Sequence, residues 1–459
     1  MKKGVLVALL AALSALVLSG CGLTSPEDLY TLPKPSTQYE SLQDSLEQLL
    51  DKGYEYSPPI SGSNTQSVQL RDLNGDGVDE AIAILRDSSG KERPLKICIL
   101  TSNGEEGYTL SCMIEGDGDM VNSVVYCQLN ATPTEEIVVG WRISSTVYAL
   151  SAYSIENGNV TELMTAPSYT KYEVRDLDQD NQEEIISIQL NSAEEGGNTA
   201  TYYDWSEDTM MSINTVSLSA TAESLESVRY NYLVGSYPAL YVSSYQRNNT
   251  SSLVTDVLSV VDKKLVNITM DSTTGNSDTI HLDLTDPKDI NSDNVLELPI
   301  AIPLRSSTMV EGSDSAYVIN WIQFTVEGSS QTVGYTYHNT ADGWYLSLPE
   351  SWFTGRQDGY MNGLILSRSD TNVGATVERS ITFYHQESLT EEPQPFLAIY
   401  KNTGSNRESR ATMGERFLLT EDGDATYSAE FLDSDWECGL NSGSLVERFK
   451  LIFTDWSTD

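Results

Sequence analysis

Histidine and cysteine are scarce in this chain, and so are the short motifs of the common enzyme classes. Three histidines, His281, His338 and His385, occur in 459 residues, and none lies near a cysteine or within a spaced acid cluster. A zinc centre and His-based nucleophilic catalysis are therefore not indicated. The sequence has no G-x-S-x-G, Walker or G-x-G-x-x-G motif, which would indicate a serine hydrolase or a nucleotide-binding protein. We therefore predict a protein without catalytic activity.

Basic residues are also few. Lysine and arginine number 27 against 67 aspartates and glutamates, which gives a formal net charge of −40. Such a surface repels nucleic acid, so we expect no nucleic-acid partner. The acids alternate with β-branched and aromatic residues, including 25 tyrosines, and this favours a folded chain over a disordered one.

The five cysteines include no C-x-x-C pair, so redox and zinc motifs are not indicated. Cys98, Cys112 and Cys127 are about fifteen residues apart on successive expected strands, and Cys438 stands alone. A Cys98–Cys112 disulfide is one possibility outside the cytoplasm. Buried thiols are the other.

Only one long apolar run occurs, and it stands at the start of the chain. Two lysines precede an apolar stretch over residues 5–18, which is the pattern of a secretory signal peptide over residues 1–20. The sequence LSGC that ends at Cys21 resembles the lipobox of bacterial lipoproteins, and the resemblance implies that Cys21 is acylated. Each buried CH₂ adds about 0.8 kcal/mol of membrane affinity, so we expect the chain at the outer face of the cell membrane, anchored at Cys21. An ordinary signal peptide with a chance cysteine is the alternative.

A tether and a helix come next. Residues 21–37 contain prolines and serines and predict a short tether. Residues 38–53 place four leucines on one face of a helix and end at a glycine, which predicts one amphipathic helix that packs on the body of the protein.

Short β-rich runs separated by turn residues dominate the chain beyond this helix, as in antiparallel hairpins. An abrupt change from acidic to apolar residues recurs at intervals of 56, 48, 55 and 58 residues. These junctions stand at Glu80, Glu136, Glu184, Ala239 and Glu297. Each interval has room for about four short strands, which is the size of one propeller blade. We predict a mainly-β fold, a β-propeller of four-stranded blades with five recognisable repeats over residues 60–340.

Three of the junctions follow an acidic loop with acids or amides at positions one, three, five and nine, and the backbone carbonyl of position seven would supply a further oxygen. The candidate metal ligands are Asp72, Asn74, Asp76, Val78 and Glu80 in the first loop, Asp176, Asp178, Asp180, Gln182 and Glu184 in the second, and Asp289, Asn291, Asp293, Val295 and Glu297 in the third. Alternate side chains of a tight loop converge on one point, and Ca²⁺ accepts about six to eight oxygen ligands. Position six is glycine or asparagine, the residues that most readily take a positive φ. We therefore expect one to three bound Ca²⁺ ions.

An EF-hand begins with a similar pattern, but it needs a bidentate acid at position twelve and a helix on each side. Position twelve is Ala83, Ser187 or Ile300, and apolar β-formers follow each loop. The sequence therefore excludes an EF-hand. An acidic turn without a metal remains the other interpretation of each loop.

The first loop, D-x-N-G-D-G-x-x-[DE] followed by an apolar strand, resembles the FG-GAP/VCBS repeat of integrin-α-type β-propellers. The resemblance covers residues 60–340 and is close in the first loop and partial in the second and third. It implies that calcium binds in loops that join blades, or strands within a blade. The junctions at Glu136 and Ala239 lack the acids and are expected to bind no metal.

The repeating pattern of acidic loop and apolar strand does not continue over residues 343–459. Further β-rich runs follow, and the last stretch places Leu445, Phe449, Ile452 and Trp456 at helical spacing. The run LPESW is similar to C-terminal domains in lipoproteins of Gram-positive, clostridial-type bacteria, a similarity that implies no chemistry. We predict a smaller C-terminal α+β domain here. A six- or seven-bladed propeller that includes these strands is the alternative.

One function is expected, with two alternatives. The expected function is a membrane-anchored, calcium-binding propeller that serves as a non-catalytic binding or scaffold module for a protein or glycan at the cell surface. A carbohydrate-active enzyme on the same scaffold, a hydrolase or a lyase, is the first alternative, and it needs two buried acids outside the three loops. A purely structural envelope component is the second.

Overall fold

The computed structural model describes residues 37–89, 92–102, 107–191, 196–313, 315–353, 363–388 and 390–452. The predicted signal peptide, Cys21 and almost all of the predicted tether lie outside these residues. Within the described part of the chain, no helix is long and apolar enough to cross a membrane.

The predicted amphipathic helix is α2 (Thr37–Leu50). Leu42 and Leu49 are buried on the first sheet, in a cluster that also contains Ala81 and Cys98. The helix ends three residues before the expected position, and Gly53 takes a φ of +94° in the turn that follows.

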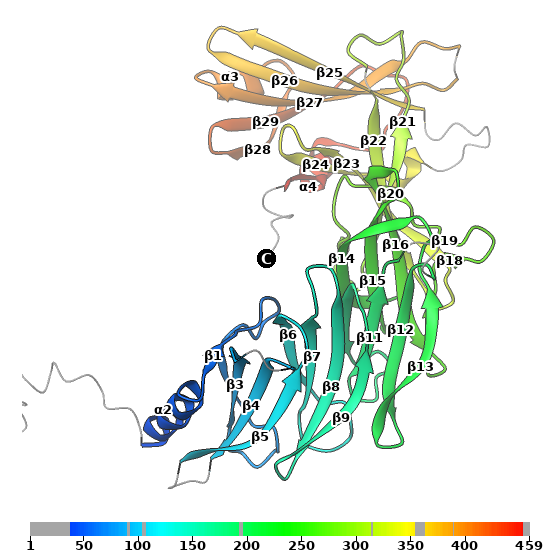
Figure 1. The fold of residues 1–459 in the computed structure, drawn as a ribbon. Coiled ribbons are helices and arrows are strands. Elements are labelled where there is room, and N and C mark those ends of the chain that lie inside the picture. Colours follow the sequence, from blue (N-terminus) through cyan, green and yellow to red (C-terminus); the bar gives the residue numbers. More distant parts are fainter. Residues whose placement is uncertain are drawn as a thin grey trace, which may run out of the picture. The chain divides into compact units, whose positions relative to one another are not determined.

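Two compact units divide the chain, and the first consists of Met1–Gln128 and Thr132–Thr165. It holds two antiparallel sheets (Figure 1). The first sheet contains β1 (Tyr54–Tyr56), β2 (Val68–Arg71), β3 (Glu80–Asp87), β4 (Leu95–Ser102) and β5 (Tyr108–Gly116), and the second contains β6 (Met120–Cys127), β7 (Glu136–Arg142), β8 (Tyr148–Glu156) and β9 (Asn159–Ala166). One apolar cluster, which includes Ile84, Ile97, Val124 and Val139, joins the two sheets.

The second unit consists of Leu129–Ala131 and Ala166–Asp459, and it contains four larger sheets and a two-stranded ribbon. The third sheet contains β10 (Lys171–Arg175), β11 (Glu184–Gln189), β12 (Thr199–Ser206) and β13 (Thr209–Ser217). The fourth contains β14 (Ala222–Leu233), β15 (Tyr237–Gln246), β16 (Asn249–Val261), β17 (Lys264–Asn267) and β20 (His281–Leu282), and the ribbon is β18 (Met270–Asp271) with β19 (Asn276–Ser277).

The fifth and sixth sheets complete the second unit. The fifth contains β21 (Leu298–Leu304), β22 (Ala316–Phe324), β23 (Ser330–Asn339), β24 (Trp344–Leu348) and β30 (Phe449–Leu451). The sixth contains β25 (Leu364–Val373), β26 (Thr376–His385), β27 (Gln394–Gly404), β28 (Phe417–Asp422) and β29 (Ala425–Phe431). The short helices are η3 (Glu350–Trp352), α3 (Arg407–Ala411) and α4 (Ser442–Arg448).

The prediction of a mainly-β fold is confirmed, since most of the described elements are strands. Within each of the first five sheets, the strands pair largely in chain order, as the strands of propeller blades do. The strands at the first four junctions, β3, β7, β11 and β15, are nearly continuously buried, and all of Glu80–Leu85 in β3 is buried. Such a run is the pattern of a strand covered on both faces. In the second unit, separate apolar clusters join the third sheet to the fourth, the fourth to the fifth and the fifth to the sixth.

The predicted start of a C-terminal domain at residue 343 falls inside the fifth sheet, because β24 pairs with β23 and β30 pairs with β24. The helical spacing of Leu445, Phe449 and Ile452 is only partly realised, and Trp456 lies outside the described residues. The helix α4 ends at Arg448, and Phe449 begins β30. Leu445 and Phe449 still share one buried cluster, because both positions face it from different elements.

Cys98 and Cys112 form no disulfide. Cys98 lies opposite Met113, and Cys112 lies opposite Ile99, so the two thiols point to opposite faces of the sheet. Burial raises the pKa of Cys98 to about 12, which keeps this thiol protonated at neutral pH. Cys98 is therefore a buried thiol, and Cys112 is a half-buried one.

Candidate metal centres

The three acidic loops occupy the same place in a hairpin. Each follows a basic residue whose backbone is the β-bridge partner of the glutamate at position nine. The pairs are Arg71 with Glu80, Arg175 with Glu184, and Lys288 with Glu297. The first loop therefore connects β2 to β3, the second connects β10 to β11, and the third leads into β21.

The backbone of the three loops turns in the same way. Position six has a positive φ in each, at Gly77 (84°), Asn181 (69°) and Asn294 (65°), as the sequence predicts. Its N–H donates to an oxygen of the first aspartate, over 2.8, 3.0 and 2.9 Å in loop order. Position four also has a positive φ, at Gly75, Gln179 and Ser292, and only the glycine gave a sequence signal for that.

The position-nine glutamate is buried in all three loops, with 4%, 1% and 0% of Glu80, Glu184 and Glu297 exposed. One carboxylate oxygen, Oε2, accepts the backbone N–H of position two at 2.8–2.9 Å each time. The loops differ in what faces the other oxygen, Oε1. That difference separates a site that needs a cation from one that does not, because an unpaired buried carboxylate oxygen is costly.

In the second loop, four carboxylates converge. Among the described residues, Asp176, Asp178, Asp180 and Glu184 each bring an oxygen within 4.8 Å of the others. Oε1 of Glu184 is buried and has no hydrogen-bond partner. The hydroxyl of Tyr202, on the neighbouring strand β12, is also buried without a partner. These oxygen atoms would suit a divalent cation that completes its coordination with water molecules.

The electrostatics of the second loop agree with this fit. Burial raises the pKa of Glu184 to about 9, and the charges of Asp178 and Asp176 add to the rise, although the N–H of Leu177 opposes it. Burial and the charge of Asp180 also raise the pKa of Asp178. The acids therefore repel one another, and a bound cation would remove that repulsion.

In the third loop, Asp289, Asp293 and Glu297 also converge within 4.8 Å. Here Oε1 of Glu297 accepts a hydrogen bond from Nε2 of Gln323 at 2.8 Å, and the same nitrogen donates to Asp293 at 2.8 Å. Gln323 lies on β22 and is only 3% exposed. The sequence gave no sign of this residue, which lies 26 positions beyond Glu297.

In the first loop, Asp72, Asp76 and Glu80 form no such group, although these residues are all described. Asn74, expected as a ligand, donates from Nδ2 to Oε1 of Glu80 at 3.0 Å and accepts the N–H of Asp76 at 2.8 Å. Both ends of the amide are therefore used within the loop. The best sequence match is thus the loop whose carboxylates gather least.

The residues expected as carbonyl ligands at position seven have one shared contact. The N–H groups of Val78, Gln182 and Val295 each donate to the position-five aspartate at 2.8–2.9 Å. This fixes the aspartates of the three loops by the same turn. The other two junctions have no such loop. Glu136 pairs in the strand register with Cys127, nine residues earlier as in the acidic loops, but the residues between them lack the alternating acids. Ala239 pairs in the same way with Asn231, eight residues earlier.

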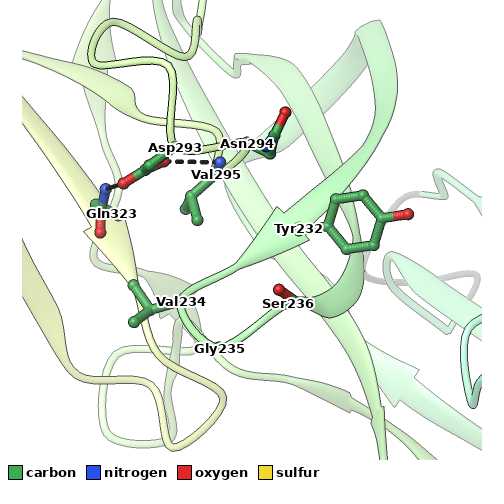
Figure 2. A pocket seen from close by; sticks show the side chains of 8 residues that line it. All are labelled: Tyr232, Val234, Gly235, Ser236, Asp293, Asn294, Val295 and Gln323. Atoms are coloured by element: carbon green, nitrogen blue, oxygen red, sulfur yellow. Dashed lines mark hydrogen bonds between the residues drawn. The ribbon is translucent and has the colours of Figure 1, made fainter.

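A cavity of about 440 Å³ lies beside the third loop (Figure 2). It is lined by Tyr232, Val234, Gly235, Ser236, Asp293, Asn294, Val295 and Gln323. In Figure 2, the amide of Gln323 points toward Asp293 on one side, and the ring of Tyr232 stands on the other. Aromatic, amide, hydroxyl and carboxylate groups thus converge on one cavity, whose volume is within the range of small-ligand sites.

The three histidines pack against other side chains of the protein. His281 is 3% exposed and contacts Thr255 through Nε2, and His385 stacks on Trp436 with ring centroids 4.2 Å apart. His338 stacks on Tyr345, and burial lowers its pKa to about 4. Each of the three imidazoles therefore contacts a neighbouring side chain of the protein.

Buried acids outside the three loops bear on the carbohydrate-active alternative. Asp256 accepts hydrogen bonds from Ser219, Asn267 and Ser277. In separate places, Asp342 accepts from Arg379 and Asn339, and Glu378 accepts from Arg410 and Arg416. Each of these three acids is held by its own donors rather than facing a second buried acid.

No protein-family model matches this chain, and no curated protein matches it. Among solved structures, it is similar to Sqt1 of Saccharomyces cerevisiae, with 14% identity, 66% of this chain and 78% of that chain covered, and a TM-score of 0.27. Sqt1 of Chaetomium thermophilum shares 9% identity over 83% of this chain and 98% of that chain, with a TM-score of 0.32. The α-L-arabinofuranosidase of Fusarium graminearum shares 11% identity over 68% and 93%, with a TM-score of 0.22. The two Sqt1 proteins are β-propellers, and the similarity to them is distant.

Proposed function

We propose that this protein is a lipid-anchored, calcium-binding module of the outer face of the cell membrane, and that it binds a surface protein or glycan without catalysis. The observation that carries the proposal is the second loop. Its four carboxylates converge, and Oε1 of Glu184 is buried without a partner. The backbone pattern of this loop, shared with two others, supports the resemblance to FG-GAP/VCBS repeats. Calcium, rather than another cation, is proposed because every donor is a hard oxygen.

The cavity beside the third loop is the proposed contact for the partner, because it joins an aromatic ring to several hydrogen-bonding groups. Both stacking on a sugar face and insertion of a side chain suit such a surface. The cation of the second loop has a structural role in this proposal. It holds together the hairpin at the start of the third sheet.

The proposal is tested by co-sedimentation of the purified chain with isolated cell envelopes. We expect retention in calcium and release by a chelator. Tyr232→Ala, in the cavity, is expected to weaken retention about tenfold, as an aromatic anchor does, whereas Tyr237→Ala, an exposed tyrosine on β15, should not. Treatment of the envelopes with protease separates a protein partner from a glycan. Release of reducing sugars or oligosaccharides from the envelopes would show turnover and contradict the proposal.

The anchor gives a separate prediction. Cys21→Ala is expected to move most of the protein from the membrane fraction into the culture medium, because it removes the acylated thiol. Immunoblots of the two fractions measure this. Cys438→Ala is the matched control and should stay with the membrane, since it leaves the lipobox intact. Equal membrane retention of both variants would refute the lipid anchor.

A further inference from the structure

The position-nine glutamates of the second and third loops face different residues on the neighbouring strand. Ile185 pairs with Tyr203, so the next step of the antiparallel register places Glu184 opposite Asp204. Leu298 pairs with Ile322, which places Glu297 opposite Gln323. The same position on the neighbouring strand therefore holds an acid beside the second loop and an amide beside the third.

Gln323 does in the third loop what a cation would do. Its single Nε2 has two hydrogens, and it gives one to Asp293 and one to Glu297, each at 2.8 Å. Nε2 of Gln331 donates to Oε1 of Gln323 at 2.7 Å, which orients the amide with its nitrogen toward the acids. The buried oxygen of Glu297 is therefore satisfied by the chain itself.

Asp204 has the opposite effect beside the second loop. A carboxylate cannot donate a hydrogen bond when ionised, and Oε1 of Glu184 has no partner. The acceptor atoms of Asp204 are partly used, since Oδ1 accepts the N–H of Trp205 at 2.6 Å. The second loop thus has four converging acids and a fifth nearby, against three in the third loop.

We infer that the residue opposite the buried glutamate selects which loop takes a cation: Asp204 keeps the second loop open to one divalent cation, and the amide of Gln323 closes the third. This inference rests on the proposed cation-binding function and assigns it to a single loop. In the first loop, the donor comes from the loop itself. Nδ2 of Asn74 donates a hydrogen bond to Oε1 of Glu80, so this oxygen is satisfied without a cation.

The test is calorimetric titration of the full chain, in detergent and freed of metal, with calcium alone as the probe. The wild-type chain is expected to take up one ion. Gln323→Glu, which is isosteric, replaces the donor nitrogen with an acceptor oxygen and is expected to add a second ion. Asp204→Asn is expected to lower the affinity of the wild-type site about tenfold, because the charge around the site sets its affinity. Ser330→Glu is the control for added charge, since it places a carboxylate on an exposed residue of the neighbouring strand β23 without touching the bond that orients Gln323, and it should leave one ion.

The outcomes separate this inference from the proposal on which it depends. If the Gln323→Glu chain folds only in calcium, with a larger calcium-dependent rise in Tm than wild type, the closing role of Gln323 is supported. One ion in both wild type and a folded Gln323→Glu, or two in the wild type, overturns the role of Gln323 and leaves calcium binding standing. No uptake by any of these chains overturns calcium binding itself.

Discussion

Calcium at a free concentration one hundred times its dissociation constant is expected to stabilise the folded protein by about 2.7 kcal/mol, and Glu184→Gln is expected to abolish most of this gain. The reason is that Oε1 of Glu184 is buried without a hydrogen-bond partner, and the carboxylate of Glu184 converges with those of the three aspartates in its loop. Thermal unfolding of wild type and variant, with calcium and with a chelator, measures the effect as a shift in Tm.

The matched control for Glu184→Gln is Glu80→Gln. Both glutamates are buried, and Oε2 of each accepts the backbone N–H of position two in its loop, a hydrogen bond that the amide oxygen of either variant can still accept. Only the second loop lacks a donor to Oε1, and the calcium-dependent shift should therefore survive in Glu80→Gln. A shift that survives in Glu184→Gln and disappears in Glu80→Gln would place the cation in the first loop instead.

Protons compete with calcium at the same site. The pKa of Glu184 is raised to about 9 by burial and by its neighbouring acids, so without a cation this carboxyl is protonated at neutral pH. Calcium binding must then release a proton, and affinity should fall as the pH falls below about 9.

Trp344→Ala is expected to lower the free energy of unfolding of the second unit by about 3–5 kcal/mol, as large-to-small changes in a packed core do. Trp344 is 1% exposed and belongs to the cluster that joins the fifth and sixth sheets. Its ring contacts Phe449 of β30, with centroids 5.4 Å apart, and Tyr337 of β23, at 5.6 Å. Denaturant unfolding followed by far-UV circular dichroism measures the loss.

An exposed aromatic residue on the same sheet provides the comparison for Trp344. Tyr317, on β22, is 38% exposed, and Tyr317→Ala should change the free energy of unfolding by less than about 1 kcal/mol, as surface substitutions do. Similar losses in the two variants would mean that Trp344 does not hold the two sheets together.

The repeat could be predicted from the sequence because its signal is local. An acidic loop and the apolar strand that follows occupy about fifteen consecutive residues, as in Arg71–Leu85 and Arg175–Gln189. The acids specify a turn, and the continuous apolar run specifies a strand buried on both faces. The blade-like sheets followed from the spacing of these junctions, and the positive φ at Gly77, Asn181 and Asn294 followed from residue type.

The sequence alone could not predict which of the three loops is best suited to bind a cation, because this depends on side chains from a neighbouring strand. Asp204 and Gln323 lie 20 and 26 residues beyond their glutamates, and only the strand register brings them opposite. Asn74 was ambiguous for a different reason. An amide offers both an oxygen for a metal and a nitrogen for a carboxylate, and in the first loop the nitrogen faces Glu80.

The fifth sheet shows a further limit of local reasoning. Its strand β30 comes from residues near the end of the chain, about a hundred positions after β24, with which it pairs. The apolar residues Leu445 and Phe449 fit a helix by their spacing, yet the backbone pairing available at β24 makes the second of them part of a strand. Tertiary pairing here outweighs the helical pattern.

The most direct measurement of the central claim is anomalous X-ray scattering from crystals of the protein soaked in a lanthanide that replaces calcium. We expect a strong anomalous peak in the second loop, within coordination distance of Oε1 of Glu184 and of carboxylate oxygens from Asp176, Asp178 and Asp180. We also expect a clearly weaker peak, or none, where Nε2 of Gln323 faces Asp293 and Glu297. An absent peak at Glu184, with its Oε1 bonded to a protein donor, would contradict the account.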